Sequence, residues 1–581
     1  MGKNKKKRNQ NETPISSVET KVPSNGSNVV KDEPTVTNNK DTGEEKRKKV
    51  LNEIERRKKQ IEDATKPIPK EAQYPRITFY PFAYALSEKF LDKACWYCLQ
   101  LNVQLSYCTN CKVARFCSEK CEELAKKDHQ PECRGYKKSK NKDYPNIEVR
   151  LLGRICSRYN MIKKGEDKAK DFYLERTSKR SVMEIWAHEQ DFAEHQDYTT
   201  QFMEIYDKLI RFYHKDDLPS KKDVFKLHCR DFINRHAICD KNYENEIGKG
   251  LYLDLCAYDH SCKPDTVFFS DGFKSILAGL HKTKDISDPN KSFYSYIDLL
   301  GTFDQRQKQL RDTWFFECKC ERCLDPKDHI LTSIKCQFCA NRDVESTIIV
   351  QGALAPRKEG RLVCPNCDII QEPFHIMECN YTIRDIGLFL DNMDQIPEHE
   401  ITAHFELFKQ KGVYCLPKQN VYRARLLLQY ASRISTNDEE KAMLMWSVED
   451  CLRHCFPQNH PGLSYFLKDL AFYCKQAGFF KDSVKYYVEC LQGLERIFVT
   501  HPLIQEIRDL LPGIQKRMIM EEQKGKTKIL SNLDFEFDES DQEMPELIEC
   551  KVSNGSSKER AQHRRSHRAP TPLPPEPVEE E

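Results

Sequence analysis

Four cysteines in the middle of the chain have the spacing of a structural zinc site. Cys318, Cys320 and Cys323 form a C-x-C-x₂-C cluster. Structural zinc is almost always held by four ligands in a tetrahedron, so a cluster of three thiolates needs a fourth. Cys262, in a short polar turn after an apolar segment, is the best candidate. Closing this site would place the turn against the segment that follows Tyr296 and build a pocket from residues far apart in the sequence.

A second group, between residues 95 and 133, has the spacing of two more zinc sites. It reads C-x₂-C, C-x₂-C, C-x₃-C and H-x₃-C. Eight ligands make two tetrahedral sites, and two zinc ions can replace a hydrophobic core in a module too small to fold alone. The eight residues are Cys95, Cys98, Cys108, Cys111, Cys117, Cys121, His129 and Cys133.

Two further C-x₂-C pairs bracket a strand-type segment and predict a zinc ribbon over residues 330–370. Such a site is closed, with no open position for catalysis; free buried thiols are the alternative. The four ligands would be Cys336, Cys339, Cys364 and Cys367. The 26 cysteines occur without a secretory signal, which favours a reducing compartment and metal binding over disulfides.

The segment from Gly248 to Cys323 resembles the C-terminal half of a SET domain. More closely, it resembles the SET and MYND domain-containing (SMYD) family of S-adenosylmethionine-dependent protein-lysine methyltransferases. The matching motifs are GxGLY at Gly248–Tyr252, DHSC at Asp259–Cys262, Y-x-D at Tyr296–Asp298 and RQKQLRDxxxFECxCxxC at Arg306–Cys323. The pattern of residues 95–133 is the complete MYND pattern, whose ligands interleave in the family. By this resemblance, Cys95, Cys98, Cys117 and Cys121 would hold one zinc, and Cys108, Cys111, His129 and Cys133 the other.

The resemblance implies an α+β multidomain protein with a β-rich SET core. The apolar run Ile77–Leu86 would supply its first strand. The last long segment has the helical pattern of a tetratricopeptide-like lobe, and both ends are too poor in apolar clusters to fold. The expected parts, in order, are a basic tail (1–70), a SET domain (71–323), the zinc-ribbon-like segment (330–370), the helical lobe (381–520) and a second tail (521–581). Within the SET domain, the MYND module (95–133) and a helical insert (145–215) interrupt the chain. A post-SET cysteine cluster (318–323) ends the domain.

The same resemblance assigns a catalytic and cofactor site. Tyr296 would be the catalytic hydroxyl at the inner end of a lysine channel, and Phe316 its wall and part of the adenine pocket. Asp259 and His260, with the backbone of their turn, would hold the adenine, and Asn234 would also touch the cofactor. Without the flanking motif, the two aromatics would be read as core residues and Asn234 as a turn or cap residue.

Methyl transfer from a sulfonium to a lysine amine needs a deprotonated amine, aligned reacting atoms and a polar cage around the methyl group. Orientation supplies much of the barrier reduction, and preorganised oxygens stabilise the polarised methyl. Burial in a narrow apolar channel lowers the pKa of the substrate lysine.

Three departures from the family pattern fall on one cofactor site. No glycine stands between Gly43 and Gly135, so the family's G-x-G loop is missing. Asp259 and Asp265 replace asparagines, and a carboxylate accepts hydrogen bonds but cannot donate them. The segment before Tyr296 reads ISDPNKSF in place of the family's glycine-and-acid turn. The sequence therefore supports two readings: an S-adenosylmethionine-dependent protein-lysine methyltransferase that also holds structural zinc, or a catalytically weakened adaptor whose MYND module and helical lobe bind peptides.

Net charge and hydropathy give only limited information about the binding partners. The net charge of +3 says little about them, and no apolar run approaches the length of a membrane span. We expect a monomer acting on histone or other proteins, with proline-rich peptides as MYND ligands. Basic clusters at Lys3–Arg8 and Glu44–Lys49 suggest nuclear localisation, in a protein found in nucleus and cytoplasm. Direct nucleic-acid binding is the weaker alternative, because these clusters lack a docking motif.

Overall fold

The computed structural model describes residues 74–530 apart from 140–143, 167–179, 243, 244 and 343, together with Asn52, Glu55, Arg56, Lys59 and Lys66. The chain divides into two units, Met1–Arg57 and Lys58–Glu581, and all contacts below lie within the second. Both basic clusters and the proline-rich segment Pro570–Pro577 lie outside the described residues.

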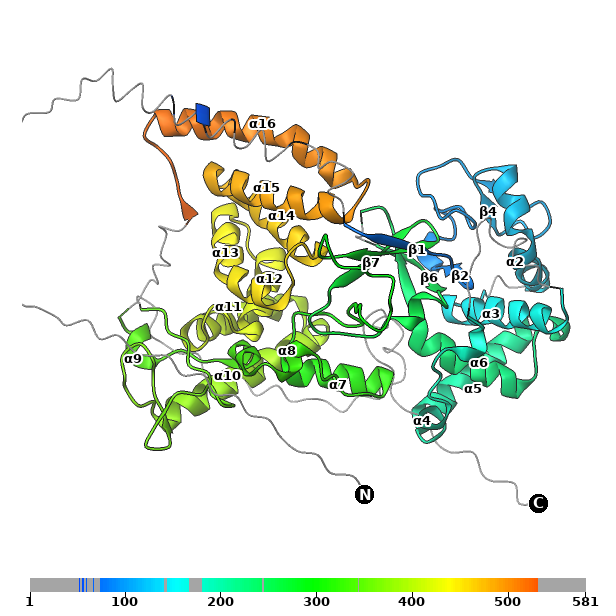
Figure 1. Ribbon diagram of the computed structural model, residues 1–581, viewed down its shortest axis with the longest axis horizontal. Coiled ribbons are helices and arrows are strands. Elements are labelled where there is room, and N and C mark those ends of the chain that lie inside the picture. Colours follow the sequence, from blue (N-terminus) through cyan, green and yellow to red (C-terminus); the bar gives the residue numbers. More distant parts are fainter. Residues whose placement is uncertain are drawn as a thin grey trace, which may run out of the picture. The chain divides into compact units, whose positions relative to one another are not determined.

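Two three-stranded antiparallel sheets carry the site (Figure 1). In one, β8 (Lys274–Gly279) lies between β1 (Arg76–Phe79) and β7 (Thr266–Asp271). In the other, β6 (Glu246–Leu251) lies between β2 (Ala83–Leu86) and β5 (Arg235–Cys239), so that both Ala83 and Arg235 stand opposite Leu251.

The apolar run predicted as one strand over Ile77–Leu86 forms two strands in different sheets. Pro81 separates β1 from β2. Because proline has no N–H to donate to a ladder, a central strand cannot continue through it. The first half of the run therefore pairs with β8 and the second half with β6.

The prediction of a β-rich core is wrong for the described residues. The longest strands there have six residues, whereas the helices reach 22 residues. The remaining sheets are two-stranded: β3 (Ser106–Tyr107) with β4 (Arg115–Phe116), and β9 (Arg357–Lys358) with β10 (Arg361–Leu362). Helices built from the insert and the C-terminal segment supply most of the regular structure around these short strands.

A ladder of three buried arginines covers the free edge of β2. Arg150, Arg154 and Arg158 lie one turn apart on α3 (Ile147–Lys163) and donate to the carbonyl oxygens of Leu86, Tyr84 and Phe82, respectively. Four helical residues rise about 6 Å, and two strand residues span about 6.6 Å. The two repeats match, so each guanidinium meets the next carbonyl along the strand and the edge is closed without another strand.

Aromatic residues join the other helices of the first half. α5 (Gln196–Phe212) buries Tyr198, Phe202, Ile205, Leu209 and Phe212 at helical spacing. Its neighbours are α4 (Glu189–Ala193) and α6 (Lys221–Asn234), whose Phe192 and Phe232 pack on Tyr198 with ring centroids 4.5 and 5.4 Å away. These helices lie in the predicted insert and in the segment that leads into β5.

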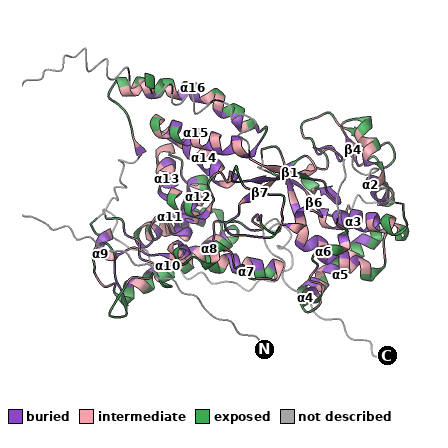
Figure 2. Cartoon of the chain, in the orientation of Figure 1, coloured by how far each residue is buried: buried purple, intermediate pink, exposed green. Residues whose placement is uncertain are grey.

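The C-terminal segment is all helical, as predicted. Successive helices pack against one another, and their buried apolar residues form one cluster (Figure 2). Gly478, at φ +86°, makes the turn between the predicted helical pair at 467–494. The helices are α10 (Pro373–Asn392), α11 (Glu398–Cys415), α12 (Val421–Arg433), α13 (Asp438–Cys455), α14 (Pro461–Gln476), α15 (Phe480–Ile497) and α16 (Pro502–Gln523). In the described part of the chain, none of the helices has both the length and the apolar character that crossing a membrane requires.

Candidate functional site

Each of the four predicted zinc sites has its ligand atoms gathered within 4.8 Å of one another. In the MYND module they interleave as the resemblance implies, and Cys262 joins the post-SET cysteines as the fourth ligand. Fifteen thiols and one imidazole are the soft donor set that zinc prefers. The groups are Cys95, Cys98, Cys117 and Cys121; Cys108, Cys111, His129 and Cys133; Cys262, Cys318, Cys320 and Cys323; and Cys336, Cys339, Cys364 and Cys367.

The second MYND site is tied to the sheet by a buried ion pair. Glu132 lies on α2 (Glu119–Lys138), close to the zinc-ligand His129, and is fully buried. It accepts two hydrogen bonds from Arg154, at 2.8 and 2.7 Å. Burial opposes ionisation, but the charge and hydrogen bonds of Arg154 hold the pKa of Glu132 well below its usual range. Since Arg154 also donates to Tyr84 of β2, the MYND module and the sheet share one charge network.

The polar turn and Tyr296 lie together, as the sequence predicts. The backbone at Asp259–Ser261 exchanges hydrogen bonds with Tyr294. The Tyr296 N–H donates to Nδ1 of His260 at 3.0 Å, and Nε2 of the same ring lies 3.2 Å from the sulfur of Cys262. One imidazole thus connects the zinc cluster with the predicted catalytic residue.

The hydroxyl of Tyr296 belongs to a chain of buried polar groups. It donates to the carbonyl oxygen of Tyr258 at 2.8 Å, and the side chain also hydrogen-bonds Tyr294. The Tyr294 hydroxyl lies 2.8 Å from Nε2 of the buried His236. Burial raises the pKa of Tyr296, and the nearby Asp259 and Cys256 raise it further, so the phenol stays protonated near neutral pH.

Aromatic rings surround Tyr296. Its centroid lies 5.3 Å from His260, 6.5 Å from Phe316 and 5.5 Å from Trp314. Trp314 ends α7 (Phe303–Trp314), and Phe315 follows in the left-handed region at φ 59°. This turn sends Phe315 toward Phe192 while Phe316 faces His260, at 6.1 Å. Three of the predicted site residues, His260, Tyr296 and Phe316, therefore share one aromatic cluster.

Asn234 and Asp259 are placed differently from these three. Asn234 ends α6, and its amide nitrogen donates to the carbonyl oxygens of Trp186 and Arg230, both at 2.8 Å. Its donor is therefore engaged within the protein. Asp259 is exposed at the turn, where its carboxylate can only accept hydrogen bonds.

Lys284 balances the charge of Asp265, the second aspartate that replaces an asparagine of the family. The sequence did not reveal this pairing. Asp265 accepts a hydrogen bond from the Phe293 N–H at 2.7 Å and forms an ion pair with Lys284. Lys284 stands just before the segment that lacks the family's usual turn. The charge introduced by Asp265 is therefore balanced locally, and the strand end at Thr266 keeps its bonds to Phe293.

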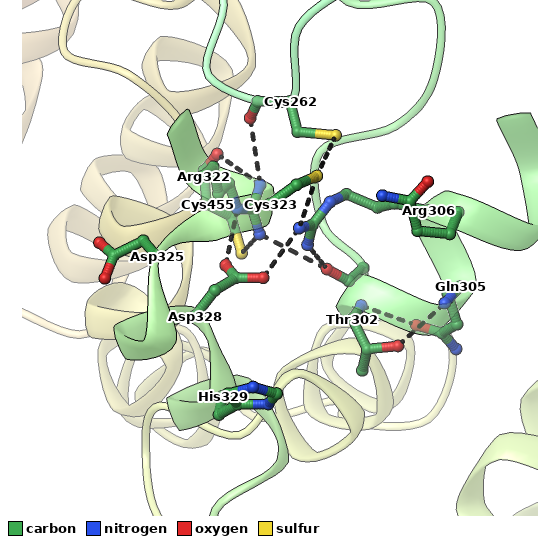
Figure 3. A network of polar contacts seen from close by, with 12 residues as sticks. Cys262, Thr302, Gln305, Arg306, Arg322, Cys323, Asp325, Asp328, His329 and Cys455 are labelled. Carbon is green, nitrogen blue, oxygen red and sulfur yellow. Dashed lines mark hydrogen bonds and ion pairs between the residues drawn. The ribbon is translucent and has the colours of Figure 1, made fainter. Parts of the chain in front are cut away.

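A polar network behind the post-SET cysteines was also missed (Figure 3). Asp328 accepts from Arg306 and from Arg322, both at 2.8 Å. Arg322, in the short helix α8 (Glu321–Leu324), also donates to the carbonyl oxygens of Leu299 and Cys455, at 3.0 and 3.3 Å. The only sequence signal was the presence of Arg and Asp among the cysteines, which is common on exposed surfaces.

A hollow of about 220 Å³ lies next to this network. Leu299 lies on one of its walls and Phe456, which follows Cys455, on another; Tyr294 also lines it. Its lining residues come from β7, from the segment 294–299 and from the loop between α13 and α14: Val267, Phe268, Tyr294, Leu299, Phe456 and His460 among them. The lining therefore mixes apolar groups with polar ones such as Asp298 and His460.

Comparison with known proteins finds a family model and several relatives with similar sequences. The MYND finger family model matches residues 95–133. Histone-lysine N-methyltransferase SMYD3 of Homo sapiens is 30% identical over 245 residues, covering 42% of this chain and 54% of that protein. The chain is thus similar to lysine methyltransferases of the SMYD family. N-lysine methyltransferase SMYD2-B of Danio rerio is 27% identical over 246 residues, 42% of this chain and 53% of its own.

The match to the SMYD family is partial in extent. The chain spans about half the length of the first two relatives. Histone-lysine N-methyltransferase Smyd1 of Mus musculus is 23% identical over 359 residues, 57% of this chain and 70% of that protein. These SMYD relatives are named as lysine methyltransferases, and zinc binding by the MYND finger and the further cysteine clusters follows from the family model and the ligand geometry.

Proposed function

We propose that this protein is an S-adenosylmethionine-dependent protein-lysine N-methyltransferase built on a SET core, acting on histone or other proteins. One observation carries the proposal: Tyr296 is held in place at its backbone by His260 and at its hydroxyl by Tyr258, inside the cluster that also contains Phe316. Homology to named lysine methyltransferases supports the same reaction class.

The residues present fit the adenine end of the cofactor. When bound, S-adenosylmethionine would supply the electrophilic methyl group. Phe316 and the ring face of His260 would border the adenine, and the turn at Asp259 would offer acceptors but no side-chain donor. Because its amide nitrogen donates to the carbonyl oxygen of Trp186, Asn234 would hold the chain in place there and would not donate to the cofactor.

Tyr296 would act on the substrate amine. Its O–H is already committed to Tyr258, so its oxygen can accept a hydrogen bond from the amine and orient the nitrogen lone pair. The apolar walls around it would favour the neutral amine over the ammonium ion. The raised pKa of Tyr296 keeps the phenol uncharged during this step.

The hollow beside Tyr294 is the place we propose for a side chain of the protein substrate. Its walls meet the C-terminal helices and the segment that carries Tyr296. The MYND module would bind proline-rich peptides, and the protein would act as a chromatin regulator in the nucleus as well as in the cytoplasm. The nuclear localisation can be tested by replacing the lysines and arginine of Lys3–Arg8 by alanine in a fluorescent fusion. An unchanged nuclear signal would show that this cluster is not the nuclear-localisation signal.

Calorimetry with the zinc-loaded full chain tests the cofactor. A dissociation constant in the micromolar range, about −8 kcal/mol, is expected, followed by methylation of histone or cell-extract proteins that Tyr296→Phe abolishes. The exposed Asp259 and the engaged Asn234 favour a second candidate, an adaptor that retains the fold for peptide binding. No heat at millimolar cofactor, with all zinc present, would select the adaptor.

A further inference from the structure

Both ring nitrogens of His260 have partners inside the protein. Nδ1 accepts from the Tyr296 N–H at 3.0 Å, and Nε2 lies 3.2 Å from Cys262 Sγ. The residue is only 7% exposed. His260 and Cys262 are two residues apart in the sequence, whereas His260 and Tyr296 are 36 residues apart.

The direction of the two hydrogen bonds follows from the donors available. A backbone N–H can only donate, so Nδ1 must present its lone pair to Tyr296. A neutral imidazole carries one proton, which is then on Nε2 and faces Cys262 Sγ. A zinc-bound sulfur is a thiolate, and a charged acceptor makes the stronger hydrogen bond. The ring is thereby fixed in one tautomer between the cluster and Tyr296.

We propose that His260 is a positioning residue that links the cluster of Cys262, Cys318, Cys320 and Cys323 to Tyr296. With zinc bound, Cys262 Sγ would be held as a thiolate that orients the ring, and the ring holds the backbone of Tyr296. Histidines that bind a metal are commonly oriented by a hydrogen bond to a carboxylate or carbonyl group. Here His260 is not a ligand, and it links a ligand cysteine to Tyr296. The consequence for methyl transfer rests on the proposed function, but the link itself does not.

This assignment changes the role expected of His260. Because both nitrogens are occupied, the ring cannot hydrogen-bond an adenine without breaking one of these bonds. The cofactor could then contact only the main chain and the ring face of His260. The ring centroid of His260 lies 5.3 Å from that of Tyr296 and 6.1 Å from that of Phe316.

The link can be read in the wild-type protein without any activity assay. The full chain is loaded with cadmium-113 in place of zinc and labelled with nitrogen-15 histidine. The imidazole N–H of His260 should show scalar coupling to one cadmium ion, and that cadmium signal should be the one absent in Cys262→Ser. A loaded Cys262 site without coupling to a histidine N–H overturns the proposal.

Variants test the second half of the link. His260→Phe keeps a ring but has no acceptor for Tyr296, whereas His260→Gln keeps one acceptor and one donor. In protein labelled with nitrogen-15 tyrosine, the Tyr296 amide signal, assigned by its absence in Tyr296→Phe, should shift in the phenylalanine variant and move back toward wild type in the glutamine variant. An unchanged amide signal in His260→Phe overturns the proposal.

Kinetics separate this inference from the proposed function. Outer-shell substitutions at metal sites typically cost 10–100-fold in activity. His260→Phe should lower kcat by about that factor with little change in the KM for the protein substrate, and His260→Gln should restore part of it. If the wild type shows the cadmium coupling but never methylates a protein, the proposed function fails and the link stands. If activity is present and His260→Phe retains full kcat, the positioning role fails.

Discussion

Arg322, next to a zinc-ligand cysteine, donates to the carbonyl oxygen of Cys455, the last residue of α13. The same guanidinium donates to Leu299, and Leu299 and Phe456 both line the hollow beside Tyr294. One side chain therefore holds two walls of the proposed substrate site. The post-SET zinc cluster thus has structural consequences in two directions, through His260 to Tyr296 and through Arg322 to the helical lobe.

Asp328 holds this arrangement together, so its removal should be costly. It is 6% exposed and accepts from both Arg306 and Arg322. Burial opposes its ionisation, but the hydrogen bond from His454 and the charges of the two arginines hold the pKa of Asp328 well below its usual range. Asp328→Asn would leave two buried cations without the carboxylate that they share. We expect a loss of about 3–5 kcal/mol in the free energy of unfolding, measured in urea.

The exposed Asp312 on α7 provides the matched control for Asp328. Asp312→Asn should change the free energy of unfolding by no more than about 0.5 kcal/mol. Equal effects of the two substitutions would show that Asp328 does not hold a buried network.

A similar argument applies to Glu132 and Arg154 between the MYND module and β2. Glu132→Gln should destabilise the protein by about 3–5 kcal/mol, because Arg154 would stay buried without its partner. Replacing both residues, as Glu132→Leu with Arg154→Met, should recover much of this loss. Glu123→Gln, at an exposed position of the same helix, is the control. Denaturant unfolding measures all of these, and an additive double variant would contradict the pairing.

Spacing alone predicted the zinc clusters, because tetrahedral coordination requires a fixed set of ligands and short C-x₂-C turns deliver them. The aromatic cluster of Tyr296 and Phe316 was predictable from a long motif. The arginine ladder was not, since arginines one turn apart on a helix ordinarily indicate an exposed face. Their burial is explained by the neighbouring edge of β2, which has no partner strand among the described residues.

Two other features depended on contacts that a single sequence does not reveal. Asp265 looked like a lost amide, yet its pairing with Lys284 needs the strand end and the following loop to meet. The β-rich core was overestimated because apolar runs were counted as strands, whereas Pro81 divides one of them and the resulting strands, β1 and β2, have only four residues each. In both cases, tertiary pairing decided the outcome.

Metal content gives a direct prediction for the four clusters. The full chain should bind four zinc ions, and Cys262→Ser should bind three, because a three-thiolate remainder holds zinc poorly at a structural site. Atomic absorption of dialysed protein measures this ratio. Cys474→Ser, at a buried cysteine outside the four clusters, should leave four. A stoichiometry unchanged by Cys262→Ser would remove that residue from the ligand set.

Acid sensitivity should come in part from His228, which lies among Phe192, Phe202 and Phe232. Burial lowers its pKa to about 3, with the charge of Arg235 adding to the effect. The unfolded chain has a histidine pKa of about 6.5, so between these values the unfolded state binds more protons than the folded one. Stability is therefore fully present above about pH 6.5 and falls as the pH drops toward 3.

His228→Phe should remove up to one proton from this dependence, seen as a smaller change in the free energy of unfolding between pH 7 and pH 4.5. His399→Gln, an exposed substitution, should leave the slope as in wild type. Equal slopes in all three proteins would mean that the buried imidazole does not titrate differently on unfolding.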